Sequence, residues 1–204
     1  MIGIIDYGMG NLASVSNALN SINTENRIIS TPAELAGVDK AILPGVGAFG
    51  DAMASLNDRR LSDAIRTFVL TDEKPFMGIC LGMQLMYDES SEFGCHQGLG
   101  LIPGKVLPLG DFTSTLSVPN IGWCQTERGT PSRLIHRLDD QALCFYFVHS
   151  FFCRAEDRSI VTCTLDYGIE CDAVIEKDSI FACQFHPEKS QASGIEILKN
   201  FAGI

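Results

Sequence analysis

Short apolar runs alternate with amphipathic segments through the first half of the chain. Leu12, Val15, Leu19 and Ile22 recur at the spacing of one helix face. Apolar runs bounded by Gly, Pro or Asp are typical of buried strands. The strands predicted here are Ile2–Asp6, Glu25–Ser30, Lys40–Leu43 and Lys74–Ile79, and the helices are Asn11–Ile22, Asp51–Leu56, Arg60–Leu70 and Gly82–Asp88.

The second half consists of closely spaced strand-like runs and ends in an amphipathic helix. The predicted strands are Lys105–Leu109, Pro119–Gln125, Leu143–Phe152, Ser159–Leu165, Ile169–Glu176 and Ser179–Phe185, and the helix is Ser193–Phe201. Strands that alternate with helices form βαβ units and build a mostly parallel sheet. The expected fold class is therefore α/β, with an open, mostly parallel central sheet, helices on both faces and antiparallel edge strands. No linker or repeat divides residues 1–204, so one domain is expected.

Composition and charge narrow the classes of function. The chain has 204 residues, 46% apolar, and a formal net charge of −10 from 15 basic and 25 acidic residues. A negative surface without a Lys/Arg cluster repels phosphate groups, so nucleic-acid and anionic-membrane binding are not expected. No apolar run approaches the roughly 20 residues of a membrane helix, and no signal-peptide pattern opens the chain. A cytoplasmic location is therefore predicted.

Eight cysteines are present and are interpreted as reduced, most of them as small core residues. None is spaced as C-x-x-C and the histidines do not cluster with them, so no metal site is predicted. Cys80 differs, because it lies between Gly78 and Gly82 where a predicted strand meets a predicted helix. This spacing is that of a nucleophile elbow, in which a sharp turn holds the nucleophile above the sheet. By itself, the pattern also fits a buried cysteine at the end of a glycine-containing strand.

A thiolate nucleophile needs a base, and the base needs a group that orients it. His186 and Glu188 follow the apolar run that ends at Phe185. Because they are two residues apart, an extended backbone would project both side chains to the same side. We therefore predict Cys80, His186 and Glu188 as the catalytic residues. His149 lies inside an apolar run and is interpreted as a hydrogen-bonded sheet residue.

Acyl chemistry also needs donors for an oxyanion. Gly45, Val46 and Gly47 follow the strand Lys40–Leu43 and form a flexible run of backbone amides. We predict that this run supplies one N–H and Leu81 the other. A Pro-Gly-x-Gly run alone is compatible with an ordinary turn.

Four runs in order resemble class I (triad-type) glutamine amidotransferases, and the resemblance extends along nearly the whole chain. They are Asp6–Leu12, Leu43–Phe49, Gly78–Gln84 and Phe185–Ser190. The resemblance implies a flavodoxin-like fold and a glutaminase that needs no cofactor. Within the family, these runs are most similar to subunits that serve a synthase of histidine biosynthesis. There the ammonia enters a (β/α)₈ barrel cyclase partner, and a heterodimer is expected.

The resemblance also implies roles for further residues. Gln84 and Glu92 would hold the amino-acid end of glutamine. The implied pocket lining is Gly47, Gly82, Ser150 and Phe151, and the implied partner interface is Asn11, Asn120 and Trp123.

One run departs from the family pattern and leaves the ammonia acceptor open. The histidine-pathway subunits commonly read Pro-His-Met-Gly-Trp-Asn, whereas this chain has Asn120 and Cys124 in place of His and the final Asn. A paralogous synthase that aminates a cell-surface sugar precursor is therefore an alternative acceptor. A catalytically silent, partner-binding subunit is a further alternative, as is a thiol hydrolase or redox sensor on a similar fold.

Overall fold

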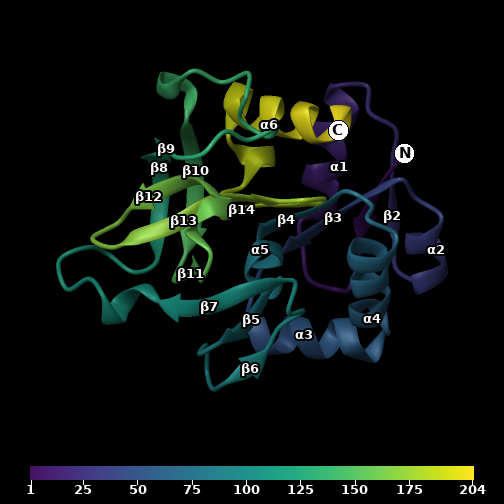
Figure 1. The fold of residues 1–204 in the computed structure, drawn as a ribbon, viewed down its shortest axis with the longest axis horizontal. Helices are drawn as coiled ribbons and strands as arrows, with labels where there is room; N and C mark the ends of the chain where they lie inside the picture. Colours follow the sequence, from purple (N-terminus) through teal and green to yellow (C-terminus); the bar gives the residue numbers. More distant parts are fainter.

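An eight-stranded sheet forms the centre of the molecule in the computed structural model, which describes residues 1–204 (Figure 1). In spatial order its strands are β2 (Asn26–Ile29), β1 (Ile2–Ile5), β3 (Lys40–Gly45), β4 (Phe76–Cys80), β14 (Ile180–Cys183), β13 (Glu170–Lys177), β12 (Val161–Asp166) and β9 (Glu127–Arg128). The pairs from β2 to β14 are parallel and those from β14 to β9 are antiparallel. The predicted mostly parallel sheet with antiparallel edge strands is confirmed.

Helices cover both faces of this sheet (Figure 1). Successive side chains of a strand point to opposite faces, and accordingly Ile4 and Ile5 belong to two separate apolar cores. Helices α1 (Leu12–Ser21) and α6 (Gln191–Gly203) pack on one face. Helices α2 (Pro32–Ala36), α3 (Phe49–Asp58) and α4 (Leu61–Arg66, continued by a π-helical turn at Thr67–Thr71) pack on the other. None of the helices has the length and apolar character needed to cross a membrane.

The region after the elbow differs from the prediction of a helix over Gly82–Asp88. The helix α5 is shorter, Leu81–Leu85, and the chain then enters strand β5 (Tyr87–Ser90). Tyr87 is fully buried and its hydroxyl donates to Asp172 at 3.1 Å. The apolar pattern that predicted a helix continues past Leu85, but tertiary packing holds Tyr87–Ser90 as a strand.

Two smaller sheets are built from strands between residues 87 and 155. One has the order β11-β7-β5-β6 and the other pairs β10 with β8. Their further strands are β6 (His96–Gln97), β7 (Ile102–Pro108), β8 (Asn120–Gln125), β10 (Cys144–His149) and β11 (Phe151–Ala155). The single strand predicted over Leu143–Phe152 is therefore wrong, because the chain leaves one sheet at Ser150 and enters the other. Apolar residues continue on both sides of this break, and only the single residue Ser150 marks it.

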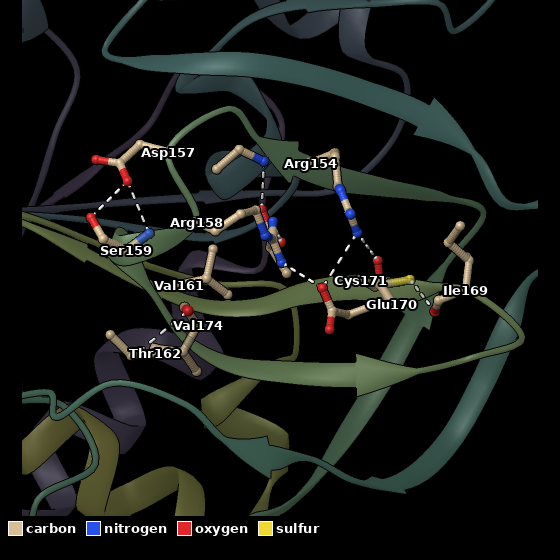
Figure 2. Close-up of polar contacts among 12 residues, drawn as sticks. Arg154, Asp157, Arg158, Ser159, Val161, Thr162, Ile169, Glu170, Cys171 and Val174 are labelled. Carbon is tan, nitrogen blue, oxygen red and sulfur yellow. Dashed lines mark hydrogen bonds and ion pairs between the residues drawn. The ribbon is translucent and has the colours of Figure 1, made fainter.

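An ion-pair network in which only Asp172 is fully buried joins the antiparallel edge to the smaller sheets. Arg154 and Arg158 converge on Glu170 (Figure 2), at 3.4 and 2.9 Å from its carboxylate. Arg158 also bonds the fully buried Asp172, which accepts the Ala155 N–H at 2.7 Å. Removing Arg158 would leave the buried Asp172 carboxylate without its cation, so this pair and the bond from the Ala155 N–H help to hold β11 against β13.

Candidate active site

Cys80 occupies a sharp turn between β4 and α5. Its backbone has φ +55° and ψ −112°, a conformation that residues other than glycine rarely adopt. Such strain persists where the surrounding structure enforces it, and a nucleophile elbow is one such place. The turn that the Gly-x-Cys-x-Gly spacing predicts is present, with Cys80 at its apex.

The two glycines of the elbow are required by close backbone packing. A Cβ at Gly82 would lie 1.8 Å from the Leu43 carbonyl oxygen, and one at Gly78 would lie 2.7 Å from the Gly82 carbonyl oxygen. Both distances are far below van der Waals contact, so neither position admits a side chain without moving the backbone. The glycines therefore let the elbow sit directly against β3.

His186 and Glu188 form a buried pair beside the elbow. Nδ1 of His186 bonds Oε1 of Glu188 at 2.8 Å, and both side chains are at most 3% exposed. The prediction of an extended segment is wrong here, because Pro187–Lys189 forms a 3₁₀ turn. The turn brings the carboxylate back under the ring. Nε2 of His186 has no hydrogen-bond partner in the protein, so it is free for proton transfer at Cys80.

The charge state of His186 follows from its neighbours. Burial acts to lower its pKa, but interaction with the nearby Cys80 sulfur and the hydrogen bond to the Glu188 carboxylate outweigh burial and raise the pKa to about 9. At neutral pH the imidazole therefore favours the protonated form, which suits an acid that donates to a leaving amine.

We expect Glu188→Gln to lower the pKa of His186 from about 9, because the amide lacks the carboxylate's charge. Loss of the orienting group should also reduce kcat by about 10- to 100-fold. NMR titration of the His186 ring, together with steady-state glutamine hydrolysis, tests both effects. An unchanged titration would show that Glu188 does not set the protonation of His186.

A pocket opens at Cys80 and contains most of the predicted substrate residues. Its volume is about 290 Å³, and it is lined by Val46, Gly47, Cys80, Leu81, Gln84, Glu92, Pro119, Val148, His149, Ser150, Phe151 and His186. Gly45 and Gly82 do not line it. A Cβ at Gly45 would meet the Tyr7 hydroxyl at 2.5 Å, so this glycine supports the pocket from behind.

Glu92 is held at the pocket by a helix end. Its Oε2 accepts the Phe49 N–H at 2.7 Å, the first amide of α3. The second family-like run thereby meets the segment after the elbow. The first run also reaches the pocket, since a Cβ at Gly47 would lie 2.7 Å from the Met9 methyl group.

The residues predicted at a partner interface lie in different environments. Asn11 is half-buried at the start of α1, and Trp123 is 48% exposed on β8. Asn120 points inward instead, is 2% exposed, and its Nδ2 lies 3.1 Å from Nε2 of His149. Cys124 contacts the Asn120 side chain at 3.6 Å. The two positions that depart from the family pattern therefore touch each other behind the pocket.

His149 is a pocket residue that the sequence did not single out as functional. Its Nδ1 bonds the Phe151 carbonyl at 2.8 Å, which agrees with the predicted hydrogen-bonded sheet histidine. Burial is the main cause that lowers its pKa, to about 4. The bond to the Phe151 carbonyl acts to raise the pKa, and the charge of the nearby His186 lowers it further. Its place in the pocket depends on the break between β10 and β11, which the sequence pattern did not reveal.

We expect acid to destabilise the protein through His149. A histidine with a folded-state pKa of about 4 stabilises the fold fully above its unfolded value near 6.5, and this contribution is lost as the pH falls toward 4. His149→Gln should remove a pH-dependent loss on the order of 3 kcal/mol between pH 7 and 4. Urea unfolding across this range tests the effect, with the exposed His136→Gln as control. Parallel profiles for wild type and His149→Gln would contradict it.

Four further buried cysteines lie outside the pocket. Cys153, Cys163, Cys171 and Cys183 belong to the apolar cores, as predicted. Burial raises the pKa of Cys163 to about 11 and that of Cys171 to about 12. Such thiols stay protonated and unreactive at neutral pH. No group of three or more His, Cys, Asp or Glu side chains is arranged to hold a metal ion.

Comparisons with known proteins agree with this geometry. The chain matches the family model "Glutamine amidotransferase class-I" over residues 3–203. Imidazole glycerol phosphate synthase subunit HisH of Desulfitobacterium hafniense (strain DSM 10664 / DCB-2) is 43% identical over 201 residues, covering 98% of this chain and 93% of the relative. The subunit of the same name from Syntrophotalea carbinolica (strain DSM 2380 / NBRC 103641 / GraBd1) is 46% identical over 208 residues and covers 100% of both chains.

A solved structure supports the fold independently. The structure of PurLQS from Thermotoga maritima superposes with a TM-score of 0.77 at 17% identity, covering 99% of this chain and 97% of that one. Likeness at this identity concerns the fold alone. The family match over residues 3–203 and the relatives at 43% and 46% identity show that the chain belongs to the class I glutamine amidotransferase family.

Proposed function

We propose that this chain is the glutamine-hydrolysing subunit of imidazole glycerol phosphate synthase and acts in histidine biosynthesis. The observation that carries the proposal is Cys80 at the apex of a strained turn, open to a pocket that His186 also lines. The relatives named HisH, at 43% and 46% identity over the full chain, supply the pathway. A cytoplasmic location remains a prediction of the sequence.

The chemistry follows from the order of groups in the pocket. The Cys80 thiolate attacks the side-chain amide carbon of glutamine, and backbone amides of Leu81 and the Gly45–Gly47 run hold the oxyanion. Protonated His186 gives its proton to the departing nitrogen, and the C–N bond breaks. Ammonia departs, and a γ-glutamyl thioester remains on Cys80. The neutral imidazole then takes a proton from water, and the oxygen of this water bonds to the thioester carbon. The C–S bond breaks, which releases glutamate and restores the thiolate beside protonated His186. Glu188 orients the ring throughout.

The partner is proposed to be a (β/α)₈ barrel cyclase in a heterodimer. Next to the pocket-lining Pro119, the strand β8 presents Ile121 and Trp123, 61% and 48% exposed. Exposed apolar groups beside a pocket are typical of a protein interface. Ammonia formed at Cys80 would then pass to the partner without entering bulk water.

The alternatives are less well supported. A silent subunit would not need the buried His186–Glu188 pair, because a buried carboxylate without a function is a net energetic burden. A sugar-precursor synthase was suggested by Asn120 and Cys124, but the buried Asn120 side chain contacts both Cys124 and His149. Their departure from the pattern is therefore compatible with a histidine-pathway partner.

The test is glutamine hydrolysis by this chain alone and with the histidine-pathway cyclase of the same organism plus its nucleotide ligand. Strong stimulation by the cyclase would support both the chemistry and the pathway. Labelling of Cys80 by a glutamine-analogue electrophile without stimulation would leave the glutaminase but reject this partner. No hydrolysis and no labelling would reject the proposal.

A further inference from the structure

Gln184 is a polar side chain that is fully buried between the nucleophile and a substrate residue. It is 0% exposed and does not line the pocket. Its Nε2 donates to Sγ of Cys80 at 3.7 Å, and its Oε1 accepts from Nε2 of Gln84 at 3.1 Å. A buried amide is retained where its hydrogen bonds are made, and both ends of this one contact the site.

The sheet register places Gln184 beside Cys80. Strands β4 and β14 are parallel and pair Ile79 with Cys183, so the next residue of each strand lies side by side. The Gln184 N–H also bonds the Ala173 carbonyl at 2.9 Å, which extends the pairing with β13 beyond the strand end. Two residues later the same segment supplies His186. One strand end therefore carries both the base and this amide.

The direction of the hydrogen bonds is fixed by a backbone carbonyl. The Phe151 carbonyl can only accept, so the group of Gln84 that faces it at 3.2 Å must be the NH₂. That NH₂ also faces Gln184, so Gln184 must offer its oxygen to Gln84. Its own NH₂ is then directed at Cys80. Although amide orientations are assigned from such networks, this network has one consistent direction.

The two contacts of the Cys80 sulfur suit opposite protonation states. The Val148 carbonyl lies 3.9 Å away and can only accept from the thiol S–H. Gln184 offers an N–H at 3.7 Å, which is strengthened when the sulfur carries a negative charge. The helix α5 has five residues, Leu81–Leu85, so a side-chain donor adds to a short helix end.

The second contact determines what Gln84 presents to the pocket. Both N–H groups of Gln84 are used, toward Phe151 and Gln184, so its Oε1 remains the free end. Gln84 lines the pocket, where a free oxygen accepts from an ammonium group. Glutamine carries such a group on its α-carbon.

We propose that Gln184 is a positioning residue of the glutaminase site, which donates to the Cys80 sulfur and holds the Gln84 amide with its oxygen toward substrate. The role of the Gln184–Gln84 contact in holding substrate rests on the proposed function. The Gln184–Cys80 contact can be tested without substrate. These two contacts are called the substrate arm and the nucleophile arm. Neither contact is available to a side chain that only fills the core.

Two substitutions separate the arms. Gln184→Glu keeps an oxygen for Gln84 but, when ionised, has no donor for sulfur. Gln184→Met preserves length and removes both contacts. Asn200→Leu is the matched control, since Asn200 is also a buried amide and is 4% exposed. Its Nδ2 donates to the Leu134 carbonyl, and neither residue lines the pocket.

The measurements are alkylation of Cys80 by iodoacetamide against pH, followed by mass spectrometry of its peptide, and KM and kcat for glutamine. Both Gln184 variants should raise the pH of half-maximal alkylation by about one unit, since a hydrogen bond to a charged group has about that strength. Gln184→Met should also raise KM by about tenfold, whereas Gln184→Glu should leave KM within about threefold of wild type. Asn200→Leu should change neither quantity.

An unshifted alkylation profile in folded Gln184→Met, or an equal shift in Asn200→Leu, would overturn the proposal. Should the buried charge prevent Gln184→Glu from folding, Gln184→Met decides both arms alone. Alkylation needs no glutamine. A wild type that is alkylated at Cys80, but that neither hydrolyses glutamine with the cyclase and its ligand nor is labelled by a glutamine analogue, would therefore reject the proposed function. The profile of Gln184→Met would still decide the contact with sulfur.

Discussion

Replacing Cys80 with alanine is expected to abolish glutamine hydrolysis, lowering kcat by a factor on the order of 10⁴ or more. The thiolate forms the covalent bond to the γ-carbon, and nothing else in the pocket can. Only one other sulfur-bearing or hydroxyl side chain lines it, Ser150, which lies on the segment between β10 and β11 rather than at the elbow. Ammonia release by the purified variant is the measurement.

The fold should survive this substitution. The strain at φ +55° arises from the Cβ atom and the backbone, and alanine carries the same Cβ. The thermal midpoint and partner binding should therefore match the wild type. In the assembled synthase, free ammonia should restore product formation in Cys80→Ala, because the lost step lies before the acceptor reaction. Glutamine hydrolysis at the wild-type rate would show that the nucleophile lies elsewhere.

The first half of the fold was predictable because its pattern is simple. The strands Ile2–Ile5 and Phe76–Cys80 are buried on both faces, so they carry no charged residue, and residues of the turn or loop type bound them. The region after the elbow was not predictable. Tyr87 continues an apolar helical pattern, and its strand conformation depends on pairing with Ile102 across β7. Such a contact between distant segments leaves no local signal.

The same division applies to the site. Cys80, His186 and Glu188 could be named because each has a distinctive neighbour, either a pair of glycines or a proline. Gln184 and His149 lie within apolar runs and look like ordinary core positions. Their contacts depend on strand register and on the break at Ser150, neither of which is written in the spacing of residues.

Substituting Gly82 with alanine is expected to disrupt the turn that holds the nucleophile. The added Cβ would lie 1.8 Å from the Leu43 carbonyl oxygen, and that atom belongs to the backbone of a central strand. A flexible side chain could turn away, but β3 is held by β1 on one side and β4 on the other. We therefore expect Gly82→Ala to destabilise the fold by about 3 kcal/mol or more, at the upper end of overpacking effects.

The measurement is the free energy of unfolding in urea, with Gly203→Ala as the matched control. Gly203 also lies in a helix, but a Cβ there meets no atom within 4 Å, so its substitution should change stability by less than about 0.5 kcal/mol. Any Gly82→Ala protein that does fold must have moved α5 away from β3, which carries Cys80 away from His186. Loss of stability and loss of glutamine hydrolysis should therefore occur together. A stable, active Gly82→Ala protein would show that the elbow tolerates displacement and that the close approach to Leu43 is not what positions the nucleophile.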